Sequence, residues 1–367
     1  MKNMAKLFGV TALVAVIGFV VASCSNGSTG GGGNQGSTQG QLAFERITDG
    51  ENAGTWRVRK GTVTSGKVVI PAYYNGTTGR AARSAEDGDP VTEIGMYGDT
   101  DGNGAFSGTD ITEIIIPDTI KRIGYYAFQN CPNLTSITIP ASVDSIGDGV
   151  FMANGNLKNI IVEAGNPYYI AEDGILYQIG GIRPGMVVID DEVGWKVLHS
   201  YPSASGNITI PAGVSHIGSF TFWGTTIASV TIPEGVLSIG DKAYAYCSSL
   251  KSITIPASVK YISYQVLQAC ASLTSITIAA GNPYYSSEGG ILYVTNNPYS
   301  GYVNDYGMTG KVLHSWPSAK GNITIPADVR MIGFGVFFGT NLTGVTIPEG
   351  VAIIGYSAFD SCTNIKT

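Results

Sequence analysis

The chain has 367 residues, a length that suits two or three ordinary domains or a single long array of repeats. Only 13% of the residues are charged, 50 are glycine, and 39 isoleucines stand against 14 leucines, which excludes a coiled coil or helical bundle because β-branched side chains favour strands. The net charge of −6 gives no basic footprint for duplex nucleic acid or an anionic membrane surface, and three His and five Cys leave little material for a metal or nucleophilic site.

The amino terminus has the pattern of an export signal. Two lysines within the first six residues precede an uncharged apolar run over residues 7–22, which is shorter than the roughly 20 apolar residues of a membrane span. This arrangement predicts a secretory signal peptide over residues 1–23. The segment Val21–Cys24 resembles the lipobox of bacterial lipoproteins, and the resemblance implies that Cys24 becomes the first residue and carries lipid. Ordinary signal-peptidase cleavage, with Cys24 incidental, is the alternative.

The next segment, residues 24–41, is predicted to be a lipid-anchored tether. It consists almost entirely of Gly, Ser, Thr, Asn and Gln, and such a stretch buries too little apolar area to offset the chain entropy lost on folding. A lipid at its start would hold the folded part away from a membrane. Residues 42–110 are interpreted as a divergent N-terminal cap and first repeat, with extra loops over 77–90 and 97–103.

Within this cap, four oxygen-bearing side chains have the spacing of a calcium-binding loop. The dipeptide Ala105-Phe106 that follows them recurs throughout the repeats, and a strand comes directly after it where a calcium loop needs a helix. The sequence therefore favours a corner of the repeat array over a metal site, and no metal or other cofactor is expected. The calcium candidates are Asp99, Asp101, Asn103 and Asp110.

A repeat of about 23 residues occupies the rest of the chain. The sequence LTSITIP begins at Leu134, and closely similar segments begin at Ile111, Leu250 and Leu273. The position held by Pro140 recurs with gaps of 22 or 23 residues, and twice with gaps of 47 or 48. The recurring positions are 117, 140, 163, 211, 233, 256, 279, 326 and 348.

The two long gaps contain inserts that are copies of each other. The motif GNPYY starts at Gly165 and again at Gly281, and the motif KVLHS starts at Lys196 and again at Lys311, so the offsets are 116 and 115. A block of about 115 residues has therefore been duplicated. We expect hairpin-type inserts at 164–207 and 280–322.

Each residue type in the repeat has a physical task. Ile137 and Ile139 alternate with Ser136 and Thr138, which gives a strand with one apolar and one polar face. A proline then ends the strand, where its missing N–H breaks no ladder. One coil alone buries too little apolar area, so coils must stack at a strand spacing of about 4.8 Å. About ten coils are expected, with parallel strands along one side.

The pattern LxxIxIPxxVxxIGxxAFxxCxx resembles the BspA-type leucine-rich repeats of bacterial surface proteins, and the match extends over residues 58–367. The resemblance implies a mainly β leucine-rich-repeat solenoid over residues 111–367, with a parallel sheet of short strands, an irregular convex side and the two duplicated inserts. It also implies adhesion, because BspA-type proteins are associated with binding extracellular-matrix and plasma proteins and other bacteria. Fold alone does not fix function.

The four cysteines after Cys24 occupy one repeat position, three residues before a strand. We interpret this position as a tight corner, because other repeats have Gly or Asn there. Cys247 and Cys270 lie in adjacent coils, at a spacing that also permits a disulfide. The residues that replace Cys in other repeats are Gly108, Asn154, Gly224 and Gly339.

The inserts carry two histidines and many tyrosines. His199 and His314 are copies of one position, and no acid or nucleophile recurs beside them, so the chain is expected not to be an enzyme. Tyrosines common to both inserts are interpreted as packing residues of the hairpin. Tyrosines found only in the second insert are candidates for ligand contact, namely Tyr299, Tyr302 and Tyr306.

These observations predict an exported protein that is lipid-anchored in a bacterial cell envelope, at the outer membrane or cell surface, and touches the membrane only through its N-terminal lipid. Its partners are expected to be extracellular proteins or other cell surfaces, and not nucleic acid. The alternatives are a structural envelope lipoprotein without a host ligand, and carbohydrate binding through the tyrosine-rich inserts. The predicted binding residues on the strands are Thr135, Ser136, Thr138, Lys251, Ser252, Thr254, Thr274, Ser275 and Thr277.

The chain stops at Ile365-Lys366-Thr367, which are the first three residues of a further strand in the repeat pattern. A solenoid needs a polar capping unit, because an open end exposes apolar core and unpaired strand groups. The sequence therefore predicts a truncated product or incomplete gene model, or another chain that covers this end.

Overall fold

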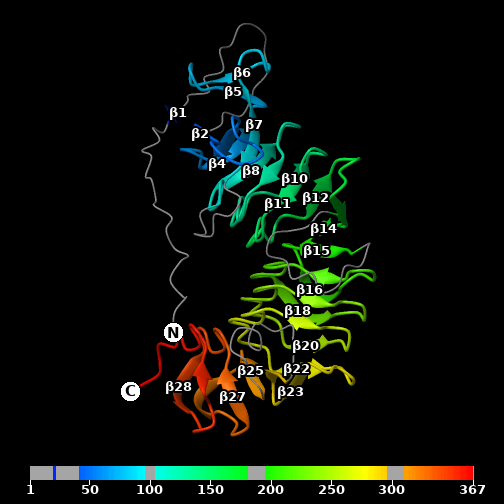
Figure 1. Cartoon of the computed structure of the whole chain (residues 1–367), viewed down its shortest axis with the longest axis vertical. Helices are drawn as coiled ribbons and strands as arrows, with labels where there is room; N and C mark the ends of the chain where they lie inside the picture. Colours follow the sequence, from blue (N-terminus) through cyan, green and yellow to red (C-terminus); the bar gives the residue numbers. More distant parts are fainter. Residues whose placement is uncertain (1–19, 22–40, 96–103, 181–194, 296–309, 367) are drawn as a thin grey trace, which may run out of the picture.

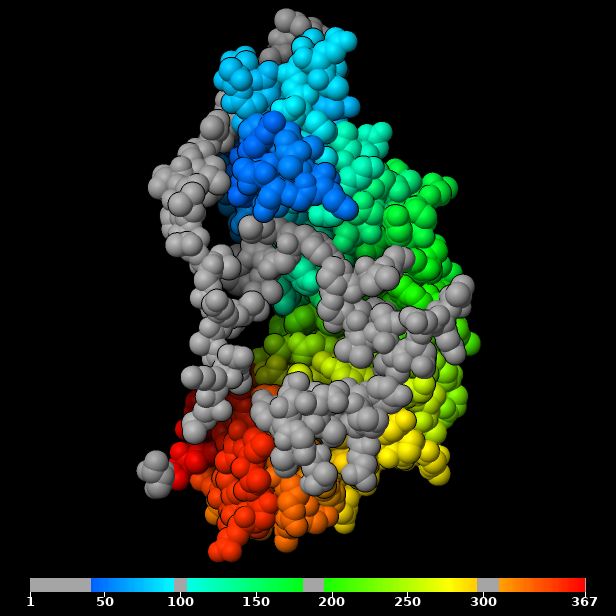
Figure 2. Space-filling model, viewed as in Figure 1, coloured from blue at the N-terminus to red at the C-terminus, as the bar shows by residue number. Residues whose placement is uncertain are grey.

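The computed structural model describes residues 20–21, 41–95, 104–180, 195–295 and 310–366. These residues form a solenoid of about nine turns that contains strands and turns but no helix, which confirms the predicted mainly β repeat fold. Figure 1 shows the turns stacked into an arc from the blue N-terminal end to the red C-terminal end, and Figure 2 shows the same order on the surface. Within the described ranges there is no helix long and apolar enough to cross a membrane.

One turn of the solenoid has three sides, as residues 250–273 illustrate. The first side is the long strand β20 (Ser252–Ile255), which Pro256 ends, and the second is a strand of only two residues, β21 (Tyr261–Ile262). The third side is a run of turns over 264–269 that leads back to the next long strand. The long strands are β4 (Ser65–Val69), β8 (Asp110–Ile115), β10 (Ser136–Ile139), β12 (Asn159–Val162), β16 (Ser205–Thr209), β18 (Thr226–Thr231), β20 (Ser252–Ile255), β22 (Ser275–Ile278), β26 (Lys320–Thr324) and β28 (Asn341–Thr346).

Backbone hydrogen bonds join successive turns on all three sides. The long strands pair in parallel within four separate sheets, β4–β8, β10–β12, β16–β18–β20–β22 and β26–β28. On the third side the N–H of Tyr244 donates to the carbonyl of Val266 at 3.0 Å, and equivalent bonds recur at other turns, so the side expected to be irregular is also a ladder. The short strands likewise pair in parallel, as β9 (Arg122–Ile123), β11 (Ser145–Ile146), β17 (His216–Ile217), β19 (Ser238–Ile239), β21, β27 (Val329–Ile332) and β29 (Ile353–Ile354).

The core is a set of columns that run along the array. In β20 the side chains of Ile253 and Ile255 are buried while Ser252 and Thr254 are exposed, as the alternating pattern predicted. Aromatic rings from the third side stack between turns, with centroid spacings of 5.0 Å to 6.0 Å, because each turn places its ring directly above the last one. These columns contain Phe106, Phe128 and Phe151, then Phe222 and Tyr244, then Phe337 and Phe359.

The N-terminal cap covers one end of the array. Its strands β2 and β3 form an antiparallel pair, and β3 joins the sheet of short strands through β7. The hairpin of β5 and β6 includes part of the loop predicted over 77–90. The cap strands are β2 (Ala43–Arg46), β3 (Trp56–Arg59), β5 (Tyr73–Asn75), β6 (Arg80–Ala82) and β7 (Asp89–Ile94), and β1 (Val20–Val21), from the predicted signal peptide, pairs with β2.

The first insert builds a wall between two cores. Its strands β13 (Tyr169–Glu172), β14 (Ile175–Gln178) and β15 (Val197–Ser200) pair in antiparallel fashion, which confirms the expected hairpin. All four residues of β14 are buried. Leu176 packs into the core on one side, and Ile175 and Tyr177 pack into the core on the other side.

The second insert repeats this wall with β23 (Tyr285–Glu288), β24 (Ile291–Val294) and β25 (Lys311–Ser315). In β24, Leu292 faces the preceding core while Ile291 and Tyr293 face the following one. The walls therefore divide the array into three blocks. We refer to residues 41–180 as the first block, 195–295 as the middle block and 310–366 as the third block.

A tyrosine and a histidine close the edge at each wall. The N–H of Ile146 donates to the hydroxyl of Tyr169 at 2.8 Å, and the carbonyl of Ile146 lies 3.3 Å from Nε2 of His199. Tyr285 and His314 make the same two contacts with Ile262, at 2.7 Å and 3.3 Å. These side chains supply the hydrogen bonds that the next short strand would make. This agrees with the packing role expected for residues common to both inserts.

Candidate functional site

The nine binding residues predicted on the strands are all exposed. Ser252 and Thr254 lie in register beside Ser275 and Thr277, and β18 adds another serine and threonine to the same rows. Hydroxyl groups therefore repeat at every turn along the middle block. The structure places Thr135, Ser136 and Thr138 on the separate sheet β10–β12. We call the exposed side of β16–β18–β20–β22 the strand face; its role in binding stays a prediction.

Several other predicted residues lie outside the described ranges. Asp110, the calcium candidate that is described, begins β8, where it is exposed and accepts a hydrogen bond from Asn133 at 3.3 Å. Among the described residues no group of three His, Cys, Asp or Glu side chains could hold a metal ion. The residues outside are Cys24, Asp99, Asp101, Asn103, Tyr299, Tyr302 and Tyr306.

The three glycines predicted to be equivalent to the cysteines lie at a different repeat position. The Sγ of Cys247 donates to the carbonyl of Phe222 at 3.0 Å, and the hydroxyl of Thr225 donates to the same carbonyl at 2.8 Å. Thr225 and Cys247 thus occupy equivalent positions, and Gly224, which the sequence placed there, lies one residue earlier at a φ of +69°. Thr109 and Thr340 likewise occupy the position equivalent to the cysteines, one residue after Gly108 and Gly339. Asn154 occupies this position, as predicted.

The thiols at this position are free and buried in the three inner turns. Burial raises the pKa of Cys131, and it raises the pKa of Cys247 to about 11. The pKa of Cys270 is also raised by burial. Protonated thiols are poor nucleophiles and poor metal ligands, so these side chains pack the array. Cys247 and Cys270 donate to separate carbonyls and are not joined.

The third side of each turn contains a five-residue segment that we call a corner. Its first and fifth residues have a positive φ, as at Tyr126 (55°) and Asn130 (52°), and its second and third residues enter the core. Positive φ costs roughly 1 to 2 kcal/mol for a residue other than glycine. The corners are 126–130, 149–153, 220–224, 242–246, 265–269, 335–339 and 357–361.

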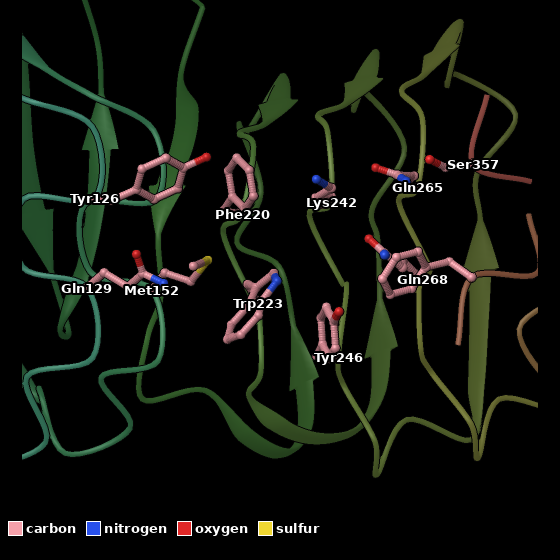
Figure 3. A pocket seen from close by; sticks show the side chains of 11 residues that line it. Tyr126, Gln129, Met152, Phe220, Trp223, Lys242, Tyr246, Gln265, Gln268 and Ser357 are labelled. Carbon is pink, nitrogen blue, oxygen red and sulfur yellow. The ribbon is translucent and has the colours of Figure 1, made fainter. Parts of the chain in front are cut away.

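The corners line one long hollow of about 380 Å³, the corner groove. Figure 3 shows its side chains in two rows. One row comes from first positions of the corners, and the other row comes mainly from fourth positions. The lining residues are Tyr126, Gln129, Met152, Phe220, Trp223, Lys242, Tyr246, Gln265, Gln268, Phe338 and Ser357.

The walls bring distant corners into contact. Each insert adds strands beside the short strands but adds no corner, so the corners before and after it meet directly. The rings of Tyr126 and Phe220 pack edge to face at 5.5 Å across Gly149, and the rings of Tyr264 and Phe334 do so at 4.7 Å across the second wall. One groove can therefore draw side chains from all three blocks.

Aromatic rings and amides dominate the groove. Trp223 and Tyr246 lie 4.8 Å apart with their planes tilted by 45°, and 39% of Tyr246 is exposed. Gln268 is only 8% exposed, yet its Oε1 has no hydrogen-bond partner among the described residues, and neither has the buried Oε1 of Gln129. Both amides line the groove.

The charges around the groove are balanced. Lys242, the only lysine or arginine among the described residues that line the groove, lies over the ring of Phe220 at 5.8 Å. Burial raises the pKa of the adjacent Asp241 to about 6, while the charge of Lys242 acts in the opposite direction. Burial, with the carboxylates of Asp148 and Asp241, raises the pKa of Tyr126 to about 12. The groove therefore offers neutral hydrogen-bonding groups and no excess of positive charge.

Sequence reasoning missed the corner groove. The sequence signal was the contrast between a constant buried pair and variable positions on either side of it. Around that pair the first and fourth positions carry Tyr and Gln, Gly and Met, Phe and Trp, or Gln and Gln in different repeats. Such variation next to a pair that stays buried in each corner before the last one marks a surface that the fold does not dictate.

Comparison with protein families identifies the repeat. The model of the BspA type leucine rich repeat region matches in six copies over residues 100–173, 201–288 and 317–367, which is more than half of the chain. No curated protein matches the chain.

Three solved structures are similar to the chain. A leucine rich cell surface protein from Faecalibacterium prausnitzii is 23% identical, with 91% of this chain and 76% of that chain covered and a TM-score of 0.42. A leucine-rich repeat protein from Eubacterium ventriosum is 18% identical over 90% and 95%, with a TM-score of 0.44. The pneumococcal vaccine antigen PcpA is 16% identical over 89% and 85%, with a TM-score of 0.37.

Proposed function

Because the chain belongs to the BspA-type leucine-rich repeat family, we propose that it is a bacterial cell-surface lipoprotein whose solenoid binds extracellular proteins or other cell surfaces. The observation that carries this proposal is the strand face, on which Ser252 and Ser275, and likewise Thr254 and Thr277, are exposed in register. A polar surface that repeats at each turn suits a large partner that contacts several turns at once. The proposal assigns no catalytic chemistry to the chain.

The strand face is expected to bind weakly in a single copy. It carries few of the aromatic and Arg anchors that dominate tight interfaces, so Kd for an immobilised matrix or plasma protein should be micromolar or weaker. Beads that display many copies should bind 10²-fold to 10⁴-fold more tightly. Surface plasmon resonance with soluble protein and with coated beads measures both values.

The matched variants for this experiment differ only in the sheet that they change. The double variant Ser252→Glu/Thr254→Glu should abolish bead binding, because it places carboxylates in the middle of the strand face. The control variant Asn322→Glu/Thr324→Glu changes two exposed residues of the separate sheet β26–β28, which carries none of the predicted binding residues, and should bind normally. Nanomolar binding by one soluble copy at these strands, or full binding by the double variant, would contradict the proposal.

Anchoring is tested by the substitution Cys24→Ala. We propose that Cys24 carries the lipid, so the variant should move from the detergent-soluble membrane fraction to the aqueous fraction. Mass spectrometry of the wild-type N-terminal peptide should show a lipid on Cys24, and a Ser25→Ala variant serves as the control that stays in the membrane fraction. An unmodified Cys24 would refute lipid anchoring and leave ordinary signal cleavage.

Protease treatment of intact cells separates adhesion from a structural role in the envelope. A solenoid at the cell surface is accessible, so the wild-type protein should be cut while an internal marker protein survives. Complete protection of the protein on intact cells, with cutting after lysis, would favour an internal scaffold and overturn the surface assignment.

A further inference from the structure

The aromatic side chains of the corner groove are not required by the fold. Trp223 and Tyr246 project away from the core, and their counterparts in other corners are as small as Ala245 and Gly339. Large apolar rings that stay partly open to solvent are a hallmark of contact surfaces. These rings therefore favour binding of a ligand with an apolar face.

The buried amides require a ligand that donates hydrogen bonds. Leaving a buried acceptor unpaired is unfavourable, and native structures rarely do so without a reason. Gln268 and Gln129 both line the groove, and among the described residues the Oε1 of each is buried without a hydrogen-bond partner. A hydroxyl group supplies the missing donor and can also accept from the amide nitrogen of the same side chain.

Charge and backbone pairing narrow the class of ligand. The positive charge of Lys242 lies over the ring of Phe220, and the acidic residue Asp241 is its neighbour in the sequence. The described lining of the groove therefore has no excess of positive charge to bind a phosphate or sulfate. Many corner N–H groups already donate within the array, as Phe220 does to the carbonyl of Asp241 at 2.9 Å. An extended peptide therefore finds few backbone donors among them to pair with as an added strand.

We propose that the corner groove binds a short segment of a neutral carbohydrate. The C–H face of a sugar ring packs on Trp223 and Tyr246, and sugar hydroxyls donate to Oε1 of Gln268 and Gln129. The volume of about 380 Å³ lies at the lower end of the range of small-ligand sites, roughly 300–1,000 Å³. This binding goes beyond the proposed function and uses a different side of the solenoid from the strand face.

The test is a titration of the full chain with neutral oligosaccharides. The panel contains two-unit and four-unit chains of glucose, galactose, mannose, xylose and N-acetylglucosamine, at up to about 10 mM. Saturation-transfer NMR detects contact between sugar and protein, and calorimetry gives Kd. At least one series should bind, with the four-unit chain binding more tightly than the two-unit chain.

Matched variants locate the site. Trp223→Ala and Gln268→Leu should each weaken binding at least tenfold. Tyr356→Ala, which removes an exposed ring that does not line the groove, should leave Kd unchanged. Thermal unfolding confirms that each variant is folded, and saturation transfer on the unchanged protein gives a readout that needs no variant.

Three outcomes would overturn the proposal. The first is no binding by any member of the panel, and the second is binding that Trp223→Ala and Gln268→Leu do not weaken. The third is that an unstructured peptide binds the groove much more tightly than the sugar and displaces it, which would assign the groove to a protein segment instead. The strand-face variant Ser252→Glu/Thr254→Glu should keep its sugar binding, so failure of the strand-face proposal and failure of this one are distinguishable.

Discussion

Replacing Phe222 with alanine is expected to lower the free energy of unfolding of the middle block by about 4 kcal/mol. The ring is fully buried, with the ring of Tyr244 stacked at 5.0 Å on one side and the ring of Tyr201 at 6.0 Å on the other. Removing it leaves a cavity in the middle of a column, and turns stacked on both sides hold the cavity open. Urea titration with amide hydrogen exchange in residues 195–295 measures the loss.

The neighbouring substitution Trp223→Ala is the matched control, because it changes the same corner on its outer side. It should cost less than about 1 kcal/mol, since Trp223 is only partly buried and packs against Tyr246 at the surface. Equal losses for the two variants would show that the column of rings does not hold the turns together. A loss spread evenly over all three blocks would show that the walls do not separate the cores.

Acidification is expected to destabilise the third block through His314. Complete burial lowers the pKa of this imidazole to about 4, whereas in the unfolded chain it is about 6.5. The unfolded state therefore binds a proton first as the pH falls. The stabilisation is fully present above pH 6.5 and is lost progressively toward pH 4, by about 3 kcal/mol in all.

In a background where Trp56, Trp195 and Trp223 are replaced by Phe, the fluorescence of Trp316 reports this effect locally, because its ring packs against Phe337 in the third block. Urea titrations at several pH values between 7.5 and 4.5 should be compared for the wild type and His314→Gln. Carboxyl groups titrate in both proteins, so their contribution cancels in the difference. The advantage of the wild type should shrink as the pH falls; a constant difference would mean that His314 takes up a proton in the folded state as readily as in the unfolded one.

Much of the fold could be predicted from the sequence, because the same pattern of apolar and polar residues recurs many times along the chain. Ile253 and Ile255 alternate with polar residues, and Pro256 ends the strand, so the strand, its buried face and its end are all local properties. The duplicated inserts could likewise be found by comparing the chain with itself. Their run Ile291–Val294 has no polar alternation, which is the pattern of a strand buried on both faces.

Other features depend on contacts that the sequence does not display. Cys247 lies three positions before Leu250, the first apolar residue of the next repeat, but Thr225 lies only two positions before the equivalent Ile227. Counting back from the strand therefore selected Gly224 instead of Thr225. The corner groove was missed for a related reason: Tyr126 and Phe220 are neighbours because the insert between them contributes no corner and because Gly149, in the corner between them, has no side chain.

The two-sided burial of β14 has a consequence for how the chain acquires its structure during synthesis. Leu176 completes the core of the first block, and Tyr169 satisfies the backbone of Ile146 from the same hairpin. Both lie before residue 180, so a chain that emerges N-terminus first holds every side chain of its first core before any of residues 195–295 has appeared. The wall therefore lets the first unit of a long repeat, in which each turn otherwise waits for its successor, fold as soon as it is made.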